Sequence, residues 1–337
     1  MCEISVIIPV YNGEPFIKGV FEALEKQSFQ RFEAIFIDDG STDKSAEMLS
    51  SHVGKTSFPF RVLTQRNLGV SSARNRGCRE ANGRYLCFID VDDTPSEDYL
   101  AYLHQAVTAQ QCRFAVGKTV RTRQNLPLKN LPAYICRLPR EEALTEYLYQ
   151  RLGCGIWTTI SERALWEEHG LAFKEGYKYG EDMYVLWKLF AFNETVAVIE
   201  SPAIYCYNNQ IHSATNRNFS PERKQALTQL QELEDFFDLA VPNFAPLFKK
   251  YAVARSCWNI LGRAALGTKN FKAFTAFFTQ IGAKETLGRL SDFQEWKIRL
   301  SSRLFCRMPR LYFILLKLYV RLFASHFLPG RPEEADK

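Results

Sequence analysis

The first hundred residues alternate near-continuous apolar runs with segments of helical spacing, and this alternation limits the possible folds most strongly. The apolar runs of strand length are Ile4 to Val10, Phe32 to Ile37, Phe60 to Leu63 and Arg84 to Ile89. Helical patterns separate them at 15–26, 43–53 and 70–81. Strands that are apolar on both sides and are separated by helices are typical of a parallel sheet covered on both faces. We therefore predict an α/β fold with a Rossmann-like, mostly parallel sheet.

The pattern changes twice further along the chain. Residues 97–209 mix helices with short strands, which we expect at 114–120, 195–199 and 204–207. After Ser220 the spacing is helical throughout, and one face carries Leu227, Leu230, Leu233 and Phe237. These changes predict three segments, 1–105, 106–215 and a C-terminal helical region at 216–337.

Composition excludes several classes of protein. The nine cysteines are scattered without a Cys-x-x-Cys pair, which favours a reduced, cytoplasmic protein over a disulfide framework or a zinc site. Residues 297–332 hold eight Lys or Arg and no Asp or Glu, so the basic charge belongs to the C-terminal tail and we expect no nucleic-acid partner. We read no signal peptide at the N-terminus, and the apolar stretch 311–316 is too short to span a bilayer.

Polar residues follow three of the predicted strands at their ends. They form the segments Pro9-Val-Tyr-Asn-Gly13, Asp38-Asp-Gly-Ser-Thr-Asp43 and Asp90-Val-Asp-Asp93. Ligands of open α/β sheets bind at the carboxyl ends of the strands, so these segments are expected to line one crevice. In an extended segment Asp90 and Asp92 would point to the same side, and a divalent cation such as Mg²⁺ or Mn²⁺ would compensate their charge. The pattern predicts a metal site for phosphate chemistry.

Each cluster also has an ordinary structural explanation. The 38–43 segment fits a turn and a helix N-cap, 67–77 fits a loop and a surface helix, and Asp90-Val-Asp92 is short enough to arise by chance. The occurrence of all three in order, at strand ends, favours the functional interpretation. A single Gly13 after the first strand argues against a dinucleotide-binding dehydrogenase.

Together these segments resemble family 2 glycosyltransferases with the GT-A fold, of the bacterial surface-polysaccharide type. The matching segments are Ile4 to Asn12, Ile37 to Asp43, Asn67 to Gly77, Phe88 to Asp93 and Gly180-Glu-Asp182. The resemblance covers about the first 215 residues. It implies inverting transfer from a nucleotide sugar, expected to be a UDP-sugar, with Mg²⁺ or Mn²⁺. It assigns 1–105 to the nucleotide sugar and 106–215 to the acceptor.

The resemblance also assigns residues. Positions matched to nucleotide-sugar contacts are Pro9, Tyr11, Asn12, Asp39, Asn67, Arg74 and Asp90. Asp39 is expected at the base or ribose, Arg74 near the nucleotide, and Asp90 towards the ribose. Asp92 is expected to bind the metal directly, and Asp93 to support the metal or a water.

Asp182 matches the catalytic base of the family. Glu181 and Asp182 precede a helical pattern, which puts them in its first turn, where the positive helix end favours an ionised carboxylate. His212 follows the last short strand, where some GT-A enzymes place a metal or diphosphate contact. A solvated loop histidine fits that place as well.

The sequence departs from the usual family pattern on the predicted acceptor half. Thr158-Thr159 stand where relatives often carry a Lys after the Trp, and Asn208 stands where they often carry an Arg. The identity of the acceptor is therefore the least constrained part of the prediction.

The basic tail has two alternative roles. Pro309 is expected in the first turn of a helix that runs to about Phe327. If the helix continues through Pro309, the basic residues of 303–327 fall on one stripe, and these are Arg303, Arg307, Arg310, Lys317 and Arg321. Such a helix can pack on its domain with the basic edge in water, or it can lie on an anionic membrane surface near a lipid-linked acceptor. The single sign of the charge favours the membrane.

The sequence predicts a cytoplasmic, metal-dependent inverting glycosyltransferase, peripheral on the inner face of the cell membrane. Its partners would be a nucleotide-sugar donor and a glycan or lipid-linked acceptor in surface polysaccharide synthesis. One rival is a metal-dependent nucleotidyl- or phosphotransferase, which would release pyrophosphate or transfer a phosphoryl group. The other is a non-catalytic nucleotide-sugar-binding protein docked on a membrane.

Overall fold

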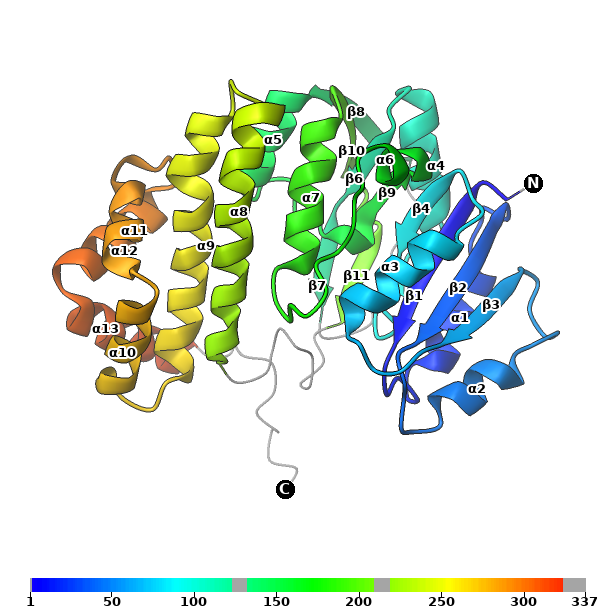
Figure 1. Cartoon of the computed structure of the whole chain (residues 1–337), viewed down its shortest axis with the longest axis horizontal. Helices are drawn as coiled ribbons and strands as arrows, with labels where there is room; N and C mark the ends of the chain where they lie inside the picture. Colours follow the sequence, from blue (N-terminus) through cyan, green and yellow to red (C-terminus); the bar gives the residue numbers. More distant parts are fainter. Residues whose placement is uncertain (1, 123–131, 209–218, 324–337) are drawn as a thin grey trace. The chain divides into compact units, whose positions relative to one another are not determined.

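The chain forms two compact units. The computed structural model describes residues 2–122, 132–208 and 219–323. The units divide between Asn208 and Asn209 (Figure 1). In these three ranges no helix combines the length and the apolar composition that crossing a membrane requires. We predicted that residues 1–105 bind the donor and that residues 106–215 bind the acceptor. This division by ligand stays a prediction.

The first unit is built on a mixed sheet of eight strands in the order β3-β2-β1-β4-β9-β6-β10-β8 (Figure 1). The strands are β1 (Ile4–Val10), β2 (Phe32–Asp38), β3 (Phe60–Thr64), β4 (Tyr85–Phe88), β6 (Phe114–Gly117), β8 (Tyr134–Pro139), β9 (Thr159–Glu162) and β10 (Thr195–Ser201). Strands β3, β2, β1 and β4 are parallel neighbours, β6 pairs parallel with β10, and β8 and β9 run antiparallel to their neighbours. The predicted α/β fold with a mostly parallel sheet is confirmed.

Seven helices and a smaller sheet complete the first unit among the described residues. The helices are α1 (Ile17–Glu25), α2 (Ser45–Ser51), α3 (Val70–Glu80), α4 (Tyr99–Ala109), α5 (Arg140–Leu148), α6 (Arg163–Glu168) and α7 (Glu181–Phe192), with the 3-10 turn η1 (Ile156–Thr158). The smaller sheet has the order β5 (Thr94–Pro95), β11 (Tyr205–Asn208) and β7 (Thr119–Thr122). Sequence patterns missed β5, β8 and β9, because β5 is only two residues long and β8 is a partly exposed edge strand without a continuous apolar run.

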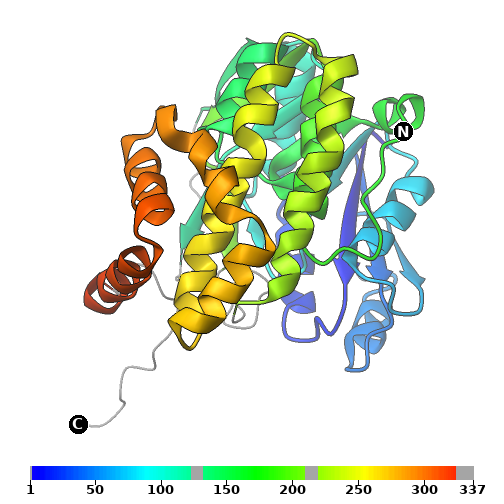
Figure 2. The same ribbon diagram turned by 60° about the vertical axis from the view of Figure 1, so that its left-hand side comes forward.

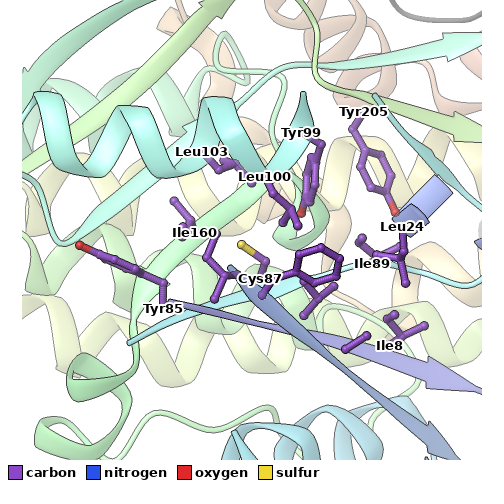
Figure 3. Close-up of a cluster of buried hydrophobic side chains, with 14 of the residues drawn as sticks. Ile8, Leu24, Tyr85, Cys87, Ile89, Tyr99, Leu100, Leu103, Ile160 and Tyr205 are labelled. Carbon is purple, nitrogen blue, oxygen red and sulfur yellow. The ribbon is translucent and has the colours of Figure 1, made fainter. Parts of the chain in front are cut away.

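Both faces of the central sheet are covered, which explains the continuous apolar strands. Ile4 and Ile8 of β1 belong to one core with helices α1 and α4 (Figure 3). Ile7 lies on the opposite face, where α3 approaches so closely that a Cβ on Gly77 would lie 2.4 Å from its Cγ2 atom. Successive strand residues alternate between the two cores, so every position of β1 must be suitable for burial.

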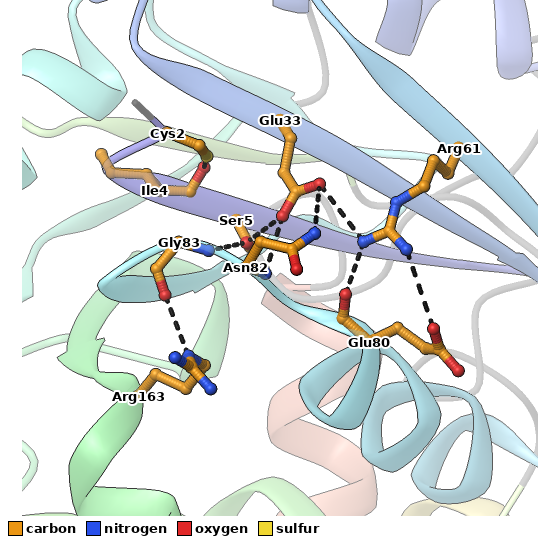
Figure 4. Close-up of polar contacts among 9 residues, drawn as sticks. All are labelled: Cys2, Ile4, Ser5, Glu33, Arg61, Glu80, Asn82, Gly83 and Arg163. Carbon is orange, nitrogen blue, oxygen red and sulfur yellow. Dashed lines mark hydrogen bonds and ion pairs between the residues drawn. The ribbon is translucent and has the colours of Figure 1, made fainter.

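A buried glutamate fastens the amino ends of β1 and β2. Oε1 of Glu33 accepts hydrogen bonds from the Ser5 hydroxyl at 2.7 Å and the Asn82 backbone N–H at 2.8 Å (Figure 4). Oε2 accepts from Nη2 of Arg61 at 3.2 Å. Burial by itself would raise the pKa of Glu33, but these donors outweigh it and lower the pKa. The network therefore stabilises the sheet while Glu33 is ionised.

We expect Glu33→Gln to lower the free energy of unfolding by about 1–3 kcal/mol at pH 7, because the charge-assisted hydrogen bonds are lost. Since the pKa of Glu33 is lowered in the folded state, its contribution is fully present above the ordinary value of 4.5 and disappears as the pH falls through the lowered pKa. Urea titrations from pH 3 to pH 7 measure the difference. Glu22→Gln, at an exposed helix pair with Lys18, is the matched control and should change little. A deficit independent of pH would contradict the role given to the charge.

In its described residues, 219–323, the second unit consists of helices and short helical turns. Its described elements are η2 (Pro221–Lys224), α8 (Gln225–Ala240), α9 (Ala245–Gly267), α10 (Phe271–Gln280), α11 (Ala283–Gly288), η3 (Arg289–Asp292), α12 (Trp296–Arg307) and α13 (Pro309–Phe323). Helices α8 and α9 lie side by side (Figure 2), and contacts between the helices show that α10, α11 and α13 pack on α9. The predicted apolar face of α8 is confirmed, because Leu227, Leu230, Leu233 and Phe237 are all buried.

The prediction that Pro309 lies in the first turn of a helix is confirmed by α13, and the continuous helix on which the basic stripe depended is not formed. Met308 has φ −138° and ψ 66°, so α12 ends at Arg307 and a separate helix begins at Pro309. Proline has no backbone N–H to continue the hydrogen-bond ladder, and its ring crowds the preceding turn. The predicted stripe of five basic residues along 303–327 is therefore divided between two helices, and residues 324–327 lie outside the described part of the chain.

Candidate active site

The loops that follow β1 and β2 are tied together by Asn12. Its backbone N–H donates to the Ser41 hydroxyl at 3.0 Å, and its Oδ1 accepts from the Thr42 backbone N–H at 2.8 Å. Asn12 has φ 50°, a left-handed conformation that asparagine tolerates better than most residues. Because β1 and β2 are parallel and in register, these two predicted clusters do meet at the carboxyl edge of the sheet.

Asp39 is buried and holds a neighbouring loop. Its Oδ1 accepts from Nε2 of Gln65 at 2.8 Å and from the Leu68 backbone N–H at 2.9 Å. Its Oδ2 accepts from the Gly69 backbone N–H at 2.8 Å. Asp39 therefore joins the end of β2 to the residues just before α3. Any contact with a base or ribose would have to use the remaining lone pairs of these oxygens.

The segment Asp90 to Asp93 is a turn. The backbone N–H of Asp93 donates to the Asp90 carbonyl at 3.1 Å, which closes a four-residue turn just after β4. The expectation that Asp90 and Asp92 point to one side of an extended segment is therefore wrong. They remain close enough for the charge of Asp90, after burial, to raise the pKa of Asp92 to about 6.

Asn208 holds this turn in place from the end of β11. Its backbone N–H donates to Oδ1 of Asp93 at 2.9 Å, and its side-chain amide donates to the Asp92 carbonyl and the Thr94 hydroxyl at 2.9 and 3.0 Å. The hydroxyl of Tyr205, from the same strand, accepts from the Asp90 backbone N–H at 3.2 Å. Sequence reasoning did not identify either residue as part of the site. The departure from the family pattern at Asn208 was the available signal.

Asp93 has an unusual environment for a carboxylate. It is 5% exposed, and among the described residues no group donates to its Oδ2 atom. Burial, with the charges of Asp90 and Asp92, raises the pKa of Asp93 to about 9. A buried carboxylate with an unused oxygen beside a second crowded carboxylate is an arrangement that a cation would stabilise.

The guanidinium of Arg74 joins the turn to helix α7. It is 4% exposed, and its Nη2 donates to Oδ1 of Asp90 at 2.9 Å while its Nη1 donates to Oε1 of Glu181 at 3.3 Å. It also lies over the ring of Phe173, with 5.4 Å between Cζ and the ring centroid. Burial would lower the pKa of Arg74, but Asp90, Glu181 and Asp182 outweigh it and raise the pKa. Arg74 is therefore an internal cation with three carboxylates around it.

Asn75, the next residue of α3, fixes the segment that leads to α7. Its side-chain amide donates to the Phe173 carbonyl at 2.9 Å, and its Oδ1 accepts from the Phe173 backbone N–H at 2.8 Å. The same amide donates to Oε1 of Glu175 at 3.1 Å. Asn75 lies inside the family-like segment 67–77 but was not singled out, since its role depends on a contact with residues about a hundred positions away.

Glu181 and Asp182 lie in the first turn of α7, as predicted. Oδ1 of Asp182 accepts from the Met183 backbone N–H at 2.7 Å. Burial, opposed by Arg74, nevertheless raises the pKa of Asp182, and burial with the charge of Asp182 raises the pKa of Glu181 to about 7. The positive helix end therefore does not determine the direction in which the pKa of Asp182 shifts. Desolvation outweighs it and makes Asp182 a stronger base than an exposed aspartate.

The remaining predicted residues are less tightly held. Tyr11 is half exposed, Asn67 is exposed, and Pro9 is paired with Ile37 across β1 and β2. His212 lies outside the described residues.

A metal ion would need ligands in addition to those that the described residues offer. Within 2–122, 132–208 and 219–323, no three side chains of His, Cys, Asp or Glu are grouped to hold one. Mg²⁺ is commonly bound by one or two carboxylates together with substrate phosphates and water. Asp92 and Asp93 fit such a site, because Asp92 has no arginine partner among the ion pairs of the described residues and Asp93 has an unused oxygen.

Comparison with known proteins identifies the family. Residues 5–163 match the family model described as glycosyl transferase family 2. This segment, a little under half of the chain, belongs to that family. The uncharacterized glycosyltransferase EpsJ of Bacillus subtilis (strain 168) is 27% identical over 259 residues, which cover 75% of this chain and 72% of EpsJ.

Two solved structures of other proteins share the fold of this chain. TarS residues 1–349 of S. aureus, in complex with UDP-GlcNAc, superimposes with a TM-score of 0.64 at 18% identity, covering 98% of this chain and 93% of that one. The mannosyltransferase PcManGT from Pyrobaculum calidifontis, in complex with GDP-Man and Mn²⁺, gives a TM-score of 0.56 at 16% identity, covering 96% and 88%. The GT-A fold expected from the sequence is confirmed.

We expect Arg74→Met to destabilise the glycosyltransferase by roughly 3–5 kcal/mol at pH 8, because Asp90, Glu181 and Asp182 lose their common cation. The pKa of Glu181 is already raised to about 7, and removing Arg74 raises the pKa of Glu181 and of Asp182 further. Their repulsion is present while they are ionised, so the deficit should shrink as the pH falls below about 7 and they take up protons.

Thermal unfolding from pH 5 to pH 8 measures this dependence. Arg79→Met, at the exposed end of the same helix, is the matched control and should cost less than about 0.5 kcal/mol. An Arg74→Met deficit that stays constant with pH would mean that lost packing, and not the carboxylates, explains it.

Proposed function

We propose that this glycosyltransferase transfers a sugar with inversion from a UDP-sugar to a hydroxyl of a glycan or lipid-linked acceptor in surface polysaccharide synthesis. The observation that carries the proposal is the buried Arg74, whose guanidinium binds both Asp90 after β4 and Glu181 at the start of α7. This contact holds the proposed base Asp182 next to the strand ends where the family places the nucleotide sugar. Support for UDP comes from the UDP-GlcNAc complex of TarS.

The donor half of the proposal uses the strand-end loops. Asn12 and Asp39 fix the loops after β1 and β2, and we assign them to shaping the wall that receives the nucleoside. Tyr11 and Asn67 have exposed side chains, and we assign them direct contacts with the donor. Pro9 lies near the end of β1, where it is paired with Ile37 of β2.

Asp182 suits the role of base. Inverting displacement requires one group to take the proton of the acceptor hydroxyl while that oxygen attacks the anomeric carbon from the face opposite the leaving group. The bond from the anomeric carbon to the diphosphate breaks, and the nucleoside diphosphate leaves with the electron pair. The raised pKa of Asp182 favours proton uptake, and Arg74 keeps the group anionic before the reaction.

Asp92 and Asp93 are the residues that would hold a divalent ion. Such an ion supplies positive charge to the departing diphosphate. The Mn²⁺ complex of PcManGT, a protein of the same fold, supports this assignment, as does the unused Oδ2 of Asp93. Asn208 would keep both carboxylates in place through its contacts with the turn.

A screen of nucleotide sugars by thermal shift tests the donor. We expect UDP-sugars to raise the melting temperature more than GDP- or ADP-sugars, and Mn²⁺ to increase the shift, because a ligand stabilises the folded state according to its affinity. In Asp92→Asn the increase with Mn²⁺ should disappear. A UDP-sugar shift that is unaffected by Mn²⁺ in the wild type would contradict the metal assignment.

Asp182→Asn tests the base. We expect kcat to fall about 10²- to 10⁴-fold while the dissociation constant for the donor changes less than about threefold, because proton transfer is lost and donor binding is kept. Product analysis by chromatography identifies the reaction, since sugar transfer releases a nucleoside diphosphate. Release of pyrophosphate would instead favour the nucleotidyltransferase, and unchanged kcat in Asp182→Asn would remove Asp182 from the base role.

A further inference from the structure

Helix α13 packs against the rest of the second unit with only one of its sides. The rings of Tyr312 and Phe313 are buried, with centroids 5.4 Å from Phe305 and 5.2 Å from Phe274. Leu316, on the same side, is partly buried. These contacts attach α13 to helices α10 and α12 of the second unit, so the helix does not need its other side to fold.

The other side of α13 is also apolar, but it is exposed. Its large side chains recur at the spacing of one helix face, and we call them the α13 apolar stripe: Leu311, Ile314, Leu315, Leu318 and Leu322. Their exposed fractions rise from 36% at Leu311 to 75% at Leu322. A continuous exposed apolar face on a helix that is already packed marks a contact surface, whereas single exposed leucines do not.

One edge of the stripe is basic. At about 100° per residue, Arg310, Lys317 and Arg321 fall within roughly 40° of one another, next to Ile314. The amine of Lys317 donates to the Thr268 carbonyl at 2.7 Å, whereas the side chains of Arg310 and Arg321 are exposed. The sequence has no Asp or Glu from 296 to 332, so acidic neighbours within this range do not offset the edge.

We propose that the α13 apolar stripe and its basic edge dock this glycosyltransferase on an anionic lipid surface. A helix with a leucine face and Lys or Arg along its border inserts the leucines at the level of the headgroups, while the cations meet acidic lipids. Charge complementarity selects this occupant. A second copy of the chain would bring an identical basic edge to the contact, and like charges oppose that pairing.

This proposal is independent of the reaction. It depends on residues of α13 in the second unit, whereas the proposed chemistry depends on Arg74, Asp92 and Asp182 in the first. The protein can therefore transfer sugar to a soluble acceptor without binding vesicles. It can also bind vesicles without transferring sugar, so the two proposals fail independently.

Flotation of the full chain with lipid vesicles tests the surface. One set of vesicles contains phosphatidylcholine only, and the other also contains about 30% phosphatidylglycerol, to supply the acidic headgroups that attract Lys and Arg. We expect binding to the anionic vesicles, little binding to the neutral ones, and weaker binding at high salt because the charges are screened.

Paired substitutions separate the two components. Arg310→Gln with Arg321→Gln should weaken binding to anionic vesicles on the order of 30-fold, since each cation near such a surface contributes about fivefold. Leu318→Gln with Leu322→Gln should weaken it at least about tenfold, because the inserted apolar area is lost. The matched control is Leu239→Gln, a leucine of α8 that is 86% exposed and lies outside the stripe, and it should bind as the wild type does.

Three results would overturn the proposal. The first is equal binding to neutral and anionic vesicles, or no binding to either. The second is a wild-type dimer, measured by light scattering, that Leu318→Gln with Leu322→Gln converts to a monomer, since a second copy would then cover the stripe. The third is binding to anionic vesicles that appears only after removal of residues 324–337 and is absent from the full chain, which would identify that segment as the natural cover. Melting temperatures within a few degrees of the wild type confirm that the exposed substitutions leave the fold intact.

Discussion

The site depends on one buried positive charge. The guanidinium of Arg74 is desolvated, which is unfavourable unless anionic groups surround it, and Asp90 and Glu181 meet that requirement from two different elements. The carboxylates depend on Arg74 in turn. Without Arg74, three carboxylates would be crowded together at the end of β4 and the start of α7, and their repulsion would separate those elements.

A second group of carboxylates has no such compensation among the described residues. Asp92 and Asp93 have raised pKa values because they are buried close to each other and to Asp90, and their turn is held by Asn208. Structures that are selected only for stability avoid this arrangement, so its presence indicates function. One internal cation thus stabilises the part of the site that carries the proposed base, while Asp92 and Asp93 have no ion-pair partner among the described residues.

Much of the fold was predictable because local patterns were strong. The continuous apolar strands β1 to β4, separated by helices, specified a parallel sheet, and the carboxyl edge of that sheet located the polar clusters. The helix that begins at Pro309 was also predicted, because proline is well suited to the first turn of a helix. Strands β5, β8 and β9 were missed, because they are short or partly exposed and are formed through pairing with distant strands.

The sequence alone determined which residue types gather at the strand ends, because strand order and the alternation of side chains follow from local apolar patterns. Only the tertiary structure decided what those residues contact. In the folded chain, Asp90 accepts a hydrogen bond from Arg74, and Asn208 donates one to Asp93. Asp182 is desolvated enough that its pKa is raised, although the positive helix end would lower it. The physical reason is that hydrogen bonds, burial and pKa depend on neighbours up to 116 positions away in the chain, and local sequence patterns do not reveal such contacts.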